Sequence, residues 1–197
     1  MNNNKNTKRN QIWWAERALQ GITYWIGHRH SMYSNYPLSE GALVAETCNL
    51  LKANLPRDIK LFCEIQYSKL FQNKETPLEL KKCRADLVVG NKIKKTDKIT
   101  PKFVFEVKRA LSIAEMNKDL RRLAVFRNRY PSVHTYLFVI AENKRPKYFV
   151  NGKGNAIRMK NLKFKGQYNV KRVLKAGHSF SKIEHAHYAC LIEVFSR

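Results

Sequence analysis

Two short segments say most about this chain: RADLVV at residues 84–89 and FVFEVK at residues 103–108. The first contains two valines, the second contains two phenylalanines and two valines, and a lysine-rich loop separates them, which predicts strands over residues 85–89 and 103–107. Because side chains alternate along a strand, Glu106 and Lys108 share one face, and Phe103, Phe105 and Val107 share the other. If the two strands form a hairpin, Asp86 lies beside Glu106. A carboxylate and an ammonium group are costly in such apolar surroundings unless they are paired or bound to something.

An acidic pair with a lysine beside it suits metal-dependent hydrolysis of a phosphodiester. Two carboxylates can hold a hard divalent cation such as Mg²⁺, which keeps several of its waters. The cation lowers the pKa of a bound water and offsets charge on the phosphodiester. Lys108 would hold the attacking water, and it could act as a base only if its pKa were depressed. The alternative is a surface ion pair of Glu106 and Lys108 on an edge strand, with Asp86 in a turn.

Helical and strand patterns alternate along the rest of the chain. Apolar spacing predicts helices over residues 12–26, 40–54 and 113–129. Further strands are predicted over residues 61–67, 133–141, 148–150, 170–174 and 188–195. After the first helix, the order is therefore a helix, three strands, a helix and a strand, followed by a basic region, and this order is typical of a layered α/β domain.

In order and spacing, these residues resemble the PD-(D/E)XK nuclease superfamily, the fold of many restriction endonucleases. The resemblance rests on Ala85-Asp86 and Glu106-Val107-Lys108, with one helix before them and one after, and it covers about residues 38–150. It implies a restriction-endonuclease-like core, in which a central mixed β-sheet is flanked by helices, and Mg²⁺-dependent cleavage of DNA. Ala85 stands where the family name has proline, but this position varies within the superfamily. The wider segments look like the restriction-type branch.

The resemblance also implies a role for each residue of the set. Asp86 and Glu106 would bind Mg²⁺, for which Mn²⁺ could substitute, and Val107 between Glu106 and Lys108 would contact the same ion. Lys108 would position the attacking water. An upstream glutamate on a helix would complete the catalytic set by orienting a water or a second ion.

Two glutamates on the helix over residues 40–54 compete for this upstream position. On a helical wheel Glu40 lies beside the centre of the apolar face, at the end of the helix that packs on the sheet, whereas Glu46 lies on the flank. We therefore favour Glu40 and keep Glu46 in reserve. The alternative for Glu40 is a first-turn glutamate that is stabilised only by the helix dipole.

The charge of the chain points to a polyanionic partner. Its 197 residues carry 38 Lys and Arg against 15 Asp and Glu, a formal net charge of +23. Such a surface attracts nucleic acid first and anionic membranes second. Residues 143–183 contain twelve Lys and Arg and no acid, with aromatic residues between them, which suits a nucleic-acid surface. A solvated basic face is the alternative. The candidate DNA-binding residues are Lys144, Arg145, Lys147, Lys153, Arg158, Lys160, Lys163, Lys165, Lys171 and Arg172.

These observations lead to one working hypothesis and two alternatives. Residues 1–37 form a basic arm and helix, residues 38–150 the nuclease core, and residues 151–197 a basic extension packed on the same domain. The chain is then a Mg²⁺-dependent endonuclease, most specifically a type II restriction enzyme that cuts duplex DNA as a homodimer, with the helix over residues 12–26 and the last strand at its interface. The alternatives are a non-catalytic basic nucleic-acid-binding protein, and a defence or repair nuclease acting on structured DNA, single strands or RNA.

The remaining composition predicts a cytoplasmic protein. The four cysteines lack zinc-site spacing, which favours reduced thiols packed as small hydrophobic side chains. The longest uninterrupted apolar run is six residues, whereas a membrane span needs about 20. The first residues are rich in asparagine and lysine and contain no apolar segment typical of a secretory signal.

Overall fold

The strands of the protein form one mixed sheet. The computed structural model describes residues 12–33, 36–71, 75–93, 98–110, 112–162, 166–176 and 186–196. Within them, seven strands lie in the order β1-β2-β3-β4-β7-β6-β5. The strands are β1 (Lys60–Gln66), β2 (Arg84–Lys92), β3 (Ile99–Arg109), β4 (His134–Ala141), β5 (Met159–Asn161), β6 (Gln167–Ala176) and β7 (His187–Phe195). All neighbouring pairs are antiparallel except β3 and β4, which are parallel.

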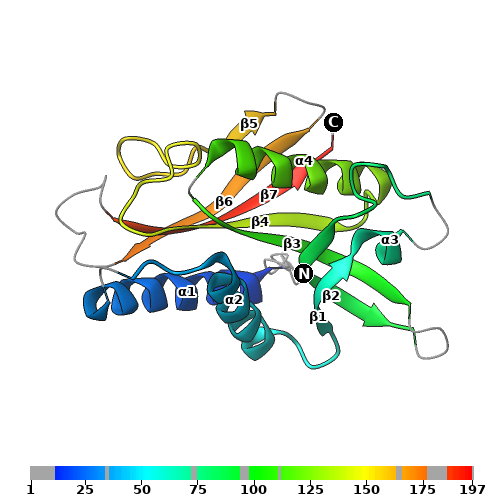
Figure 1. Cartoon of the computed structure of the whole chain (residues 1–197), viewed down its shortest axis with the longest axis horizontal. Helices are drawn as coiled ribbons and strands as arrows, with labels where there is room; N and C mark the ends of the chain where they lie inside the picture. Colours follow the sequence, from blue (N-terminus) through cyan, green and yellow to red (C-terminus); the bar gives the residue numbers. More distant parts are fainter. Residues whose placement is uncertain are drawn as a thin grey trace, which may run out of the picture.

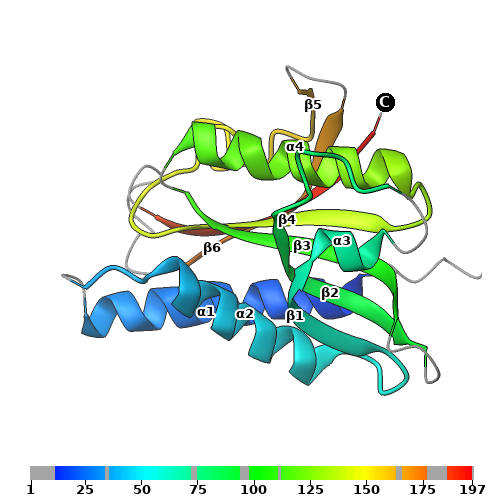
Figure 2. The same ribbon diagram turned by 45° about the vertical axis from the view of Figure 1, so that its right-hand side comes forward.

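Helices cover both faces of this sheet, which confirms the α/β class. The long helices α1 (Trp13–Met32) and α2 (Glu40–Asn54) lie on one face, and α4 (Ile113–Arg129) lies along the other, as Figures 1 and 2 show. The single-turn helix α3 (Tyr67–Leu70) follows β1 directly. Among the described helices, none is both long and apolar enough to cross a membrane.

The alternating side chains of β3 contribute to two separate cores, one on each face of the sheet, whereas the sequence predicts a core only on the face opposite Glu106 and Lys108. Phe103, Phe105 and Val107 belong to the buried cluster beneath α1 and α2, whereas Val104 belongs to the cluster beneath α4. Trp14 of α1 packs edge-on against Phe103 and Phe105, with ring centroids 5.2 and 5.7 Å away. The strand that carries Glu106 and Lys108 is therefore held from its apolar side.

Most predicted elements are present, and the differences have identifiable causes. The helices predicted over residues 40–54 and 113–129 have the observed bounds. The first helix continues to Met32, because its polar last turns still find partners such as His187, whose ring lies 4.3 Å from that of His30. The strand predicted over residues 148–150 is wrong: the segment is a turn with one isolated bridge, Val150 to Ala156. Its apolar residues are buried beneath α4 without joining the sheet.

The last strand lies inside the sheet rather than at an edge. β7 pairs with β4 on one side and β6 on the other, and it is buried along almost all of its length. The expectation that this strand forms a homodimer interface is therefore wrong. The edges of the sheet are β1 and β5.

Candidate active site

Asp86 and Glu106 are brought together by the β2–β3 hairpin. The antiparallel register pairs Leu87 with Phe105, so the next residues towards the end of β3 are Asp86 and Glu106. Asp86 Oδ2 accepts a hydrogen bond of 2.6 Å from the backbone N–H of Val107, and the two carboxyl groups also hydrogen-bond each other. The strand register thus fixes the acidic pair.

Burial perturbs both members of this pair. It raises the pKa of Glu106, which is 3% exposed, well above its usual range, and the charge of Asp86 adds to the effect. Burial also raises the pKa of Asp86 to about 6, although the Val107 N–H and the hydrogen bond from Glu106 act in the opposite direction. The hydroxyl of Tyr67 donates to Glu106 Oε1 at 2.7 Å. Two acids that repel each other in a buried site form a place where a cation can replace a shared proton.

Lys108 lies two residues beyond Glu106 on the same face and bridges two further acids. Its Nζ donates to Glu40 Oε1 at 2.7 Å and lies 3.3 Å from Asp119 Oδ2. Burial lowers the pKa of Lys108, but the hydrogen bond to Glu40 and the charges of Glu40 and Asp119 outweigh it, so the pKa is raised. The depressed pKa that a general base would need is therefore not present, and Lys108 is a charged ammonium that can orient a neighbour.

The upstream glutamate that reaches Lys108 is Glu40. It is the first residue of α2, directly after Ser39, whose side chain caps the helix by accepting the backbone N–H of Ala42 at 3.2 Å. Glu46 lies almost two turns further along the helix and does not contact Lys108. The wheel position that favours Glu40 over Glu46 corresponds to this contact.

A buried carboxylate at the end of β4 fixes the start of α2. Glu142 accepts the backbone N–H of Leu38 at 3.0 Å, and ion pairs join it to Arg109 at 3.3 Å and Arg29 at 4.0 Å. The side chain of Glu142 is only 8% exposed. Leu38 lies two residues before Glu40, and Arg109 follows Lys108. The Glu142 carboxylate therefore links the start of α2 to the end of β3, where Glu40 and Lys108 are in contact.

Two site residues, Asp119 and Tyr67, were missed by the sequence reasoning, and Arg122 lies beside them. Asp119 of α4 is 2% exposed and pairs with Lys108 and with Arg122, whose Nη1 lies 2.7 Å from Asp119 Oδ1. Burial raises the pKa of Asp119, although both cations act against it. A signal for Asp119 was present, since it is an acid on the apolar face of a predicted helix. Tyr67 gave no such signal, because its hydroxyl acts on Glu106 of another element. Arg122 is one of several cations on its helix, and the pattern does not show that its charge acts on both Asp119 and Glu106.

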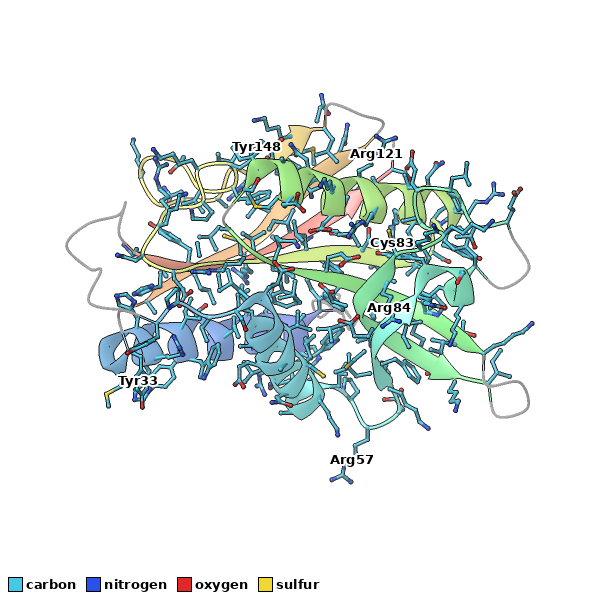
Figure 3. All side chains as sticks on the ribbon, viewed as in Figure 1. Tyr33, Arg57, Cys83, Arg84, Arg121 and Tyr148 are labelled. Atoms are coloured by element: carbon cyan, nitrogen blue, oxygen red, sulfur yellow. The ribbon has the colours of Figure 1, made fainter. Side chains whose placement is uncertain are left out.

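Most of the candidate DNA-binding residues lie on or near loops beside α4. A depression of about 550 Å³ at the first turn of α4 is lined by Lys144, Arg145, Lys147 and Tyr148, and Figure 3 shows Tyr148 beside that end of the helix. Lys144 and Lys147 are exposed. Arg145 instead donates to the backbone carbonyl of Val150 at 2.9 Å. Further exposed cations in this region are Lys153, Arg158 and Lys160.

Two other candidates are committed to ion pairs at the α1 side of the sheet. Lys171 Nζ lies 3.3 Å from Glu193 Oε2, and Arg172 Nε lies 3.1 Å from Glu16 Oε1 of α1. The structure therefore does not gather all ten predicted cations into one surface. Lys163 and Lys165 lie outside the described residues.

The acidic pair fits the requirements of Mg²⁺ better than those of zinc. In the described part of the chain, no three His, Cys, Asp or Glu side chains are close enough to hold a metal ion by themselves. Mg²⁺ does not need such a cluster, because it is bound by one or two carboxylates and keeps several waters. The donor set offered by Asp86 and Glu106 is of this kind.

The comparisons with known proteins assign no family to the chain. Neither the protein-family models, nor the curated proteins, nor the solved structures contain a match to it. The function is therefore argued from the residues and their arrangement. What the site can do chemically is bind a divalent cation next to a fixed ammonium group, close to an exposed basic surface.

Proposed function

We propose that the chain is a Mg²⁺-dependent endonuclease of the PD-(D/E)XK type that hydrolyses DNA phosphodiester bonds. The observation that carries the proposal is the convergence of Asp86, Glu106, Lys108 and Glu40, with Glu106 buried and hydrogen-bonded to Asp86, and with Lys108 paired with the exposed Glu40. The element order α2-β1-α3-β2-β3-α4-β4, in which β3 and β4 are parallel, supports a restriction-endonuclease-like core. Its most specific form is a type II restriction enzyme that cuts duplex DNA as a homodimer.

The acidic pair would hold the cation, and Mn²⁺ would substitute for Mg²⁺. When bound, the cation would supply a Lewis acid that lowers the pKa of a coordinated water. Asp86 and Glu106 would ligate it together with the backbone carbonyl of Val107. In an extended strand the carbonyl and the N–H of one residue project to the same edge, and the Val107 N–H already points at Asp86.

Lys108 would act on the water and the phosphate rather than on the cation. Its ammonium is held between Glu40 and Asp119, so its donors are restricted in direction before substrate binds. A pre-oriented donor of this kind stabilises charge that develops in the transition state, and removing one costs about 10²- to 10³-fold in rate. Glu40 would share the attacking water with Lys108.

The substrate would lie across the basic loops beside α4. Lys144 and Lys147 line the depression at the start of that helix, and Lys153, Arg158 and Lys160 extend the exposed positive surface. Contacts of lysine and arginine with phosphate set affinity and orientation without reading sequence. The strand to be cut would then pass from these loops to the acidic pair.

The decisive experiment is cleavage of long mixed-sequence duplex DNA in Mg²⁺ and in EDTA. The wild type should cut only with the metal, and Lys108→Ala and Asp86→Asn should lose roughly 100-fold or more of the rate. Lys118→Ala is the matched control, because Lys118 is an exposed lysine on α4 that pairs with Glu115. Discrete fragments would support the restriction enzyme, and a metal-dependent smear a nuclease of lower specificity. No cutting of duplex DNA, single strands or RNA in Mg²⁺ or Mn²⁺ would contradict the proposal.

A further inference from the structure

Two of the four cysteines lie in contact where α2 packs against β1. The Sγ atoms of Cys48 on α2 and Cys63 on β1 are 3.1 Å apart, and both cysteines are free thiols. Burial and the hydrogen bond to Cys48 raise the pKa of Cys63 to about 12, so Cys63 keeps its proton. Cys63 is exposed and Cys48 half-buried, which differs from the expectation that all four cysteines pack as small hydrophobic side chains; among them only Cys190 is buried.

The pair borders a groove with a positive rim. The groove has a volume of about 490 Å³, and both cysteines line it together with Lys52, Arg57 and Lys60. Figure 3 shows Arg57 projecting from the turn between α2 and β1. Three of the groove's lining residues are cations and none is acidic, while Glu64, which follows Cys63, adds one negative charge beside that thiol. The surroundings therefore favour a small anionic reagent over a neutral or cationic one.

We propose that Cys48 and Cys63 form a thiol pair that small anionic disulfides, such as glutathione disulfide, oxidise to an intramolecular disulfide. One cysteine attacks the small disulfide as its thiolate, forms a mixed disulfide and releases one small thiol. The second cysteine then attacks the sulfur of the first and releases the second small thiol. In total the cysteines lose two protons and two electrons, and the small disulfide is reduced to two thiols.

The geometry needs little change for this reaction. A disulfide bond is about 2.05 Å long, so each sulfur has to move by only about half an ångström from the observed contact. The resulting link would span 15 residues of chain and would tie α2 to β1. Because a link of this length restricts the unfolded chain, we expect the melting temperature to rise by roughly 5–10 °C. The proposal does not depend on nuclease activity.

The test is oxidation of the full chain with glutathione disulfide, followed by acid quenching and alkylation of the remaining thiols. Before alkylation we expect the intact mass to be lower by two hydrogen atoms, and after alkylation we expect two cysteines to be labelled instead of four. Digestion without reductant should yield one peptide pair joined through Cys48 and Cys63. The melting temperature should rise as above and return to its starting value in dithiothreitol. The cleavage rate, where present, should stay within about twofold, because the sulfurs already touch and the Glu40–Lys108 contact lies at the other end of α2.

Single substitutions separate this pair from the other cysteines. Cys63→Ser should prevent the link and leave a stable glutathione adduct on Cys48. Cys83→Ser is the matched control and should oxidise like the wild type, because the Cys83 thiol donates to the backbone carbonyl of Glu79 instead of another sulfur. Wild-type chains that carry only glutathione adducts, that keep all thiols, or that link Cys83 or Cys190 would overturn the proposal. These outcomes are read from mass alone and are independent of the DNA-cleavage result.

Discussion

Glu106 places a carboxyl group on a strand whose other central residues are apolar, and the structure surrounds it with polar partners. Tyr67 donates to one oxygen, and Asp86 shares a hydrogen bond with the carboxyl group. Arg122 contributes a favourable charge. A buried carboxyl is tolerated only with such partners, so the residues around Glu106 should matter for stability as well as for any chemistry.

The Tyr67 hydroxyl allows a direct test of this point. Tyr67→Phe keeps the ring but leaves one buried oxygen of Glu106 without this donor, and we expect the free energy of unfolding to fall by about 1–3 kcal/mol. Urea unfolding followed by circular dichroism would measure it. Tyr24→Phe is the control, since that side chain is 73% exposed, and its effect should stay within about 0.5 kcal/mol. Equal effects of the two changes would show that the hydroxyl of Tyr67 contributes nothing specific.

Mg²⁺ should stabilise the folded protein through the same acids. At a concentration ten times its dissociation constant, a ligand that binds only the folded state adds about 1.4 kcal/mol, or roughly 3–5 °C in melting temperature. Asp86→Asn should lose this response, because it removes one of the two carboxylates, whereas Glu115→Gln, an exposed acid on α4, should keep it. Melting curves in Mg²⁺ and in EDTA would measure this response. If Mg²⁺ raised the melting temperature of Asp86→Asn as much as that of the wild type, the cation would bind elsewhere.

The relative placement of Asp86, Glu106 and Lys108 could be predicted from the sequence, because it is set by strand alternation and one hairpin. Both are short-range properties that the residue pattern records directly. Asp119 and Tyr67 reach the same site from α4 and α3, and their contacts depend on how those helices pack on the sheet. Nothing in the local pattern specifies how those helices pack on the sheet. Of the two residues, only Asp119 could have been recognised, because it is an acid on the apolar face of a helix.

Among the secondary-structure elements, helix α2 shows that nearby residues determine where a helix begins and ends but not where it packs. Its bounds follow from Ser39 as the N-cap and from the loss of helical pattern before Pro56. Its placement depends instead on Glu142, more than 100 residues away in the chain, which holds the backbone of Leu38. The strand prediction over residues 148–150 was wrong because it relied on the local pattern alone. The run is apolar because it covers the core, and it does not join the sheet.

The long-range contact between Glu142 and the backbone of Leu38 predicts that substitutions of Glu142 and Glu40 have coupled effects on cleavage. Glu142→Gln weakens the ion pairs to Arg109 and Arg29 and loosens the start of α2, so DNA cleavage should slow roughly 10-fold through a misplaced Glu40. The decisive measurement is a double-mutant cycle with Glu40→Gln. The two effects on kcat should be less than additive by about 0.5–3 kcal/mol, whereas a merely structural role of Glu142 would give additive losses.

In the whole molecule, some lysine and arginine side chains pair with acids of the fold, and others are exposed on the surface. Some cations are held by acids within the fold, as Lys171 is by Glu193 and Arg172 by Glu16. Others, such as Lys144 and Lys147, are exposed beside the start of α4. The sequence shows only the total, because a lysine that binds phosphate and a lysine that pairs with a distant acid look the same in composition. The net charge of +23 therefore predicts a polyanionic partner but not the surface that meets it.

The salt dependence of DNA binding separates these two groups of cations. In EDTA, which prevents cleavage, the logarithm of the association constant should fall linearly with the logarithm of salt concentration, by about 0.9 for each phosphate neutralised. Changing Lys144, Lys147 and Lys153 together to alanine should make the slope shallower by about 2–3. Changing Lys171 and Arg172 to alanine should leave it nearly unchanged, because those cations already have carboxylate partners on the α1 side. Equal losses in the two variants, measured by fluorescence anisotropy, would mean that DNA also contacts the α1 side and that the path proposed beside α4 is incomplete.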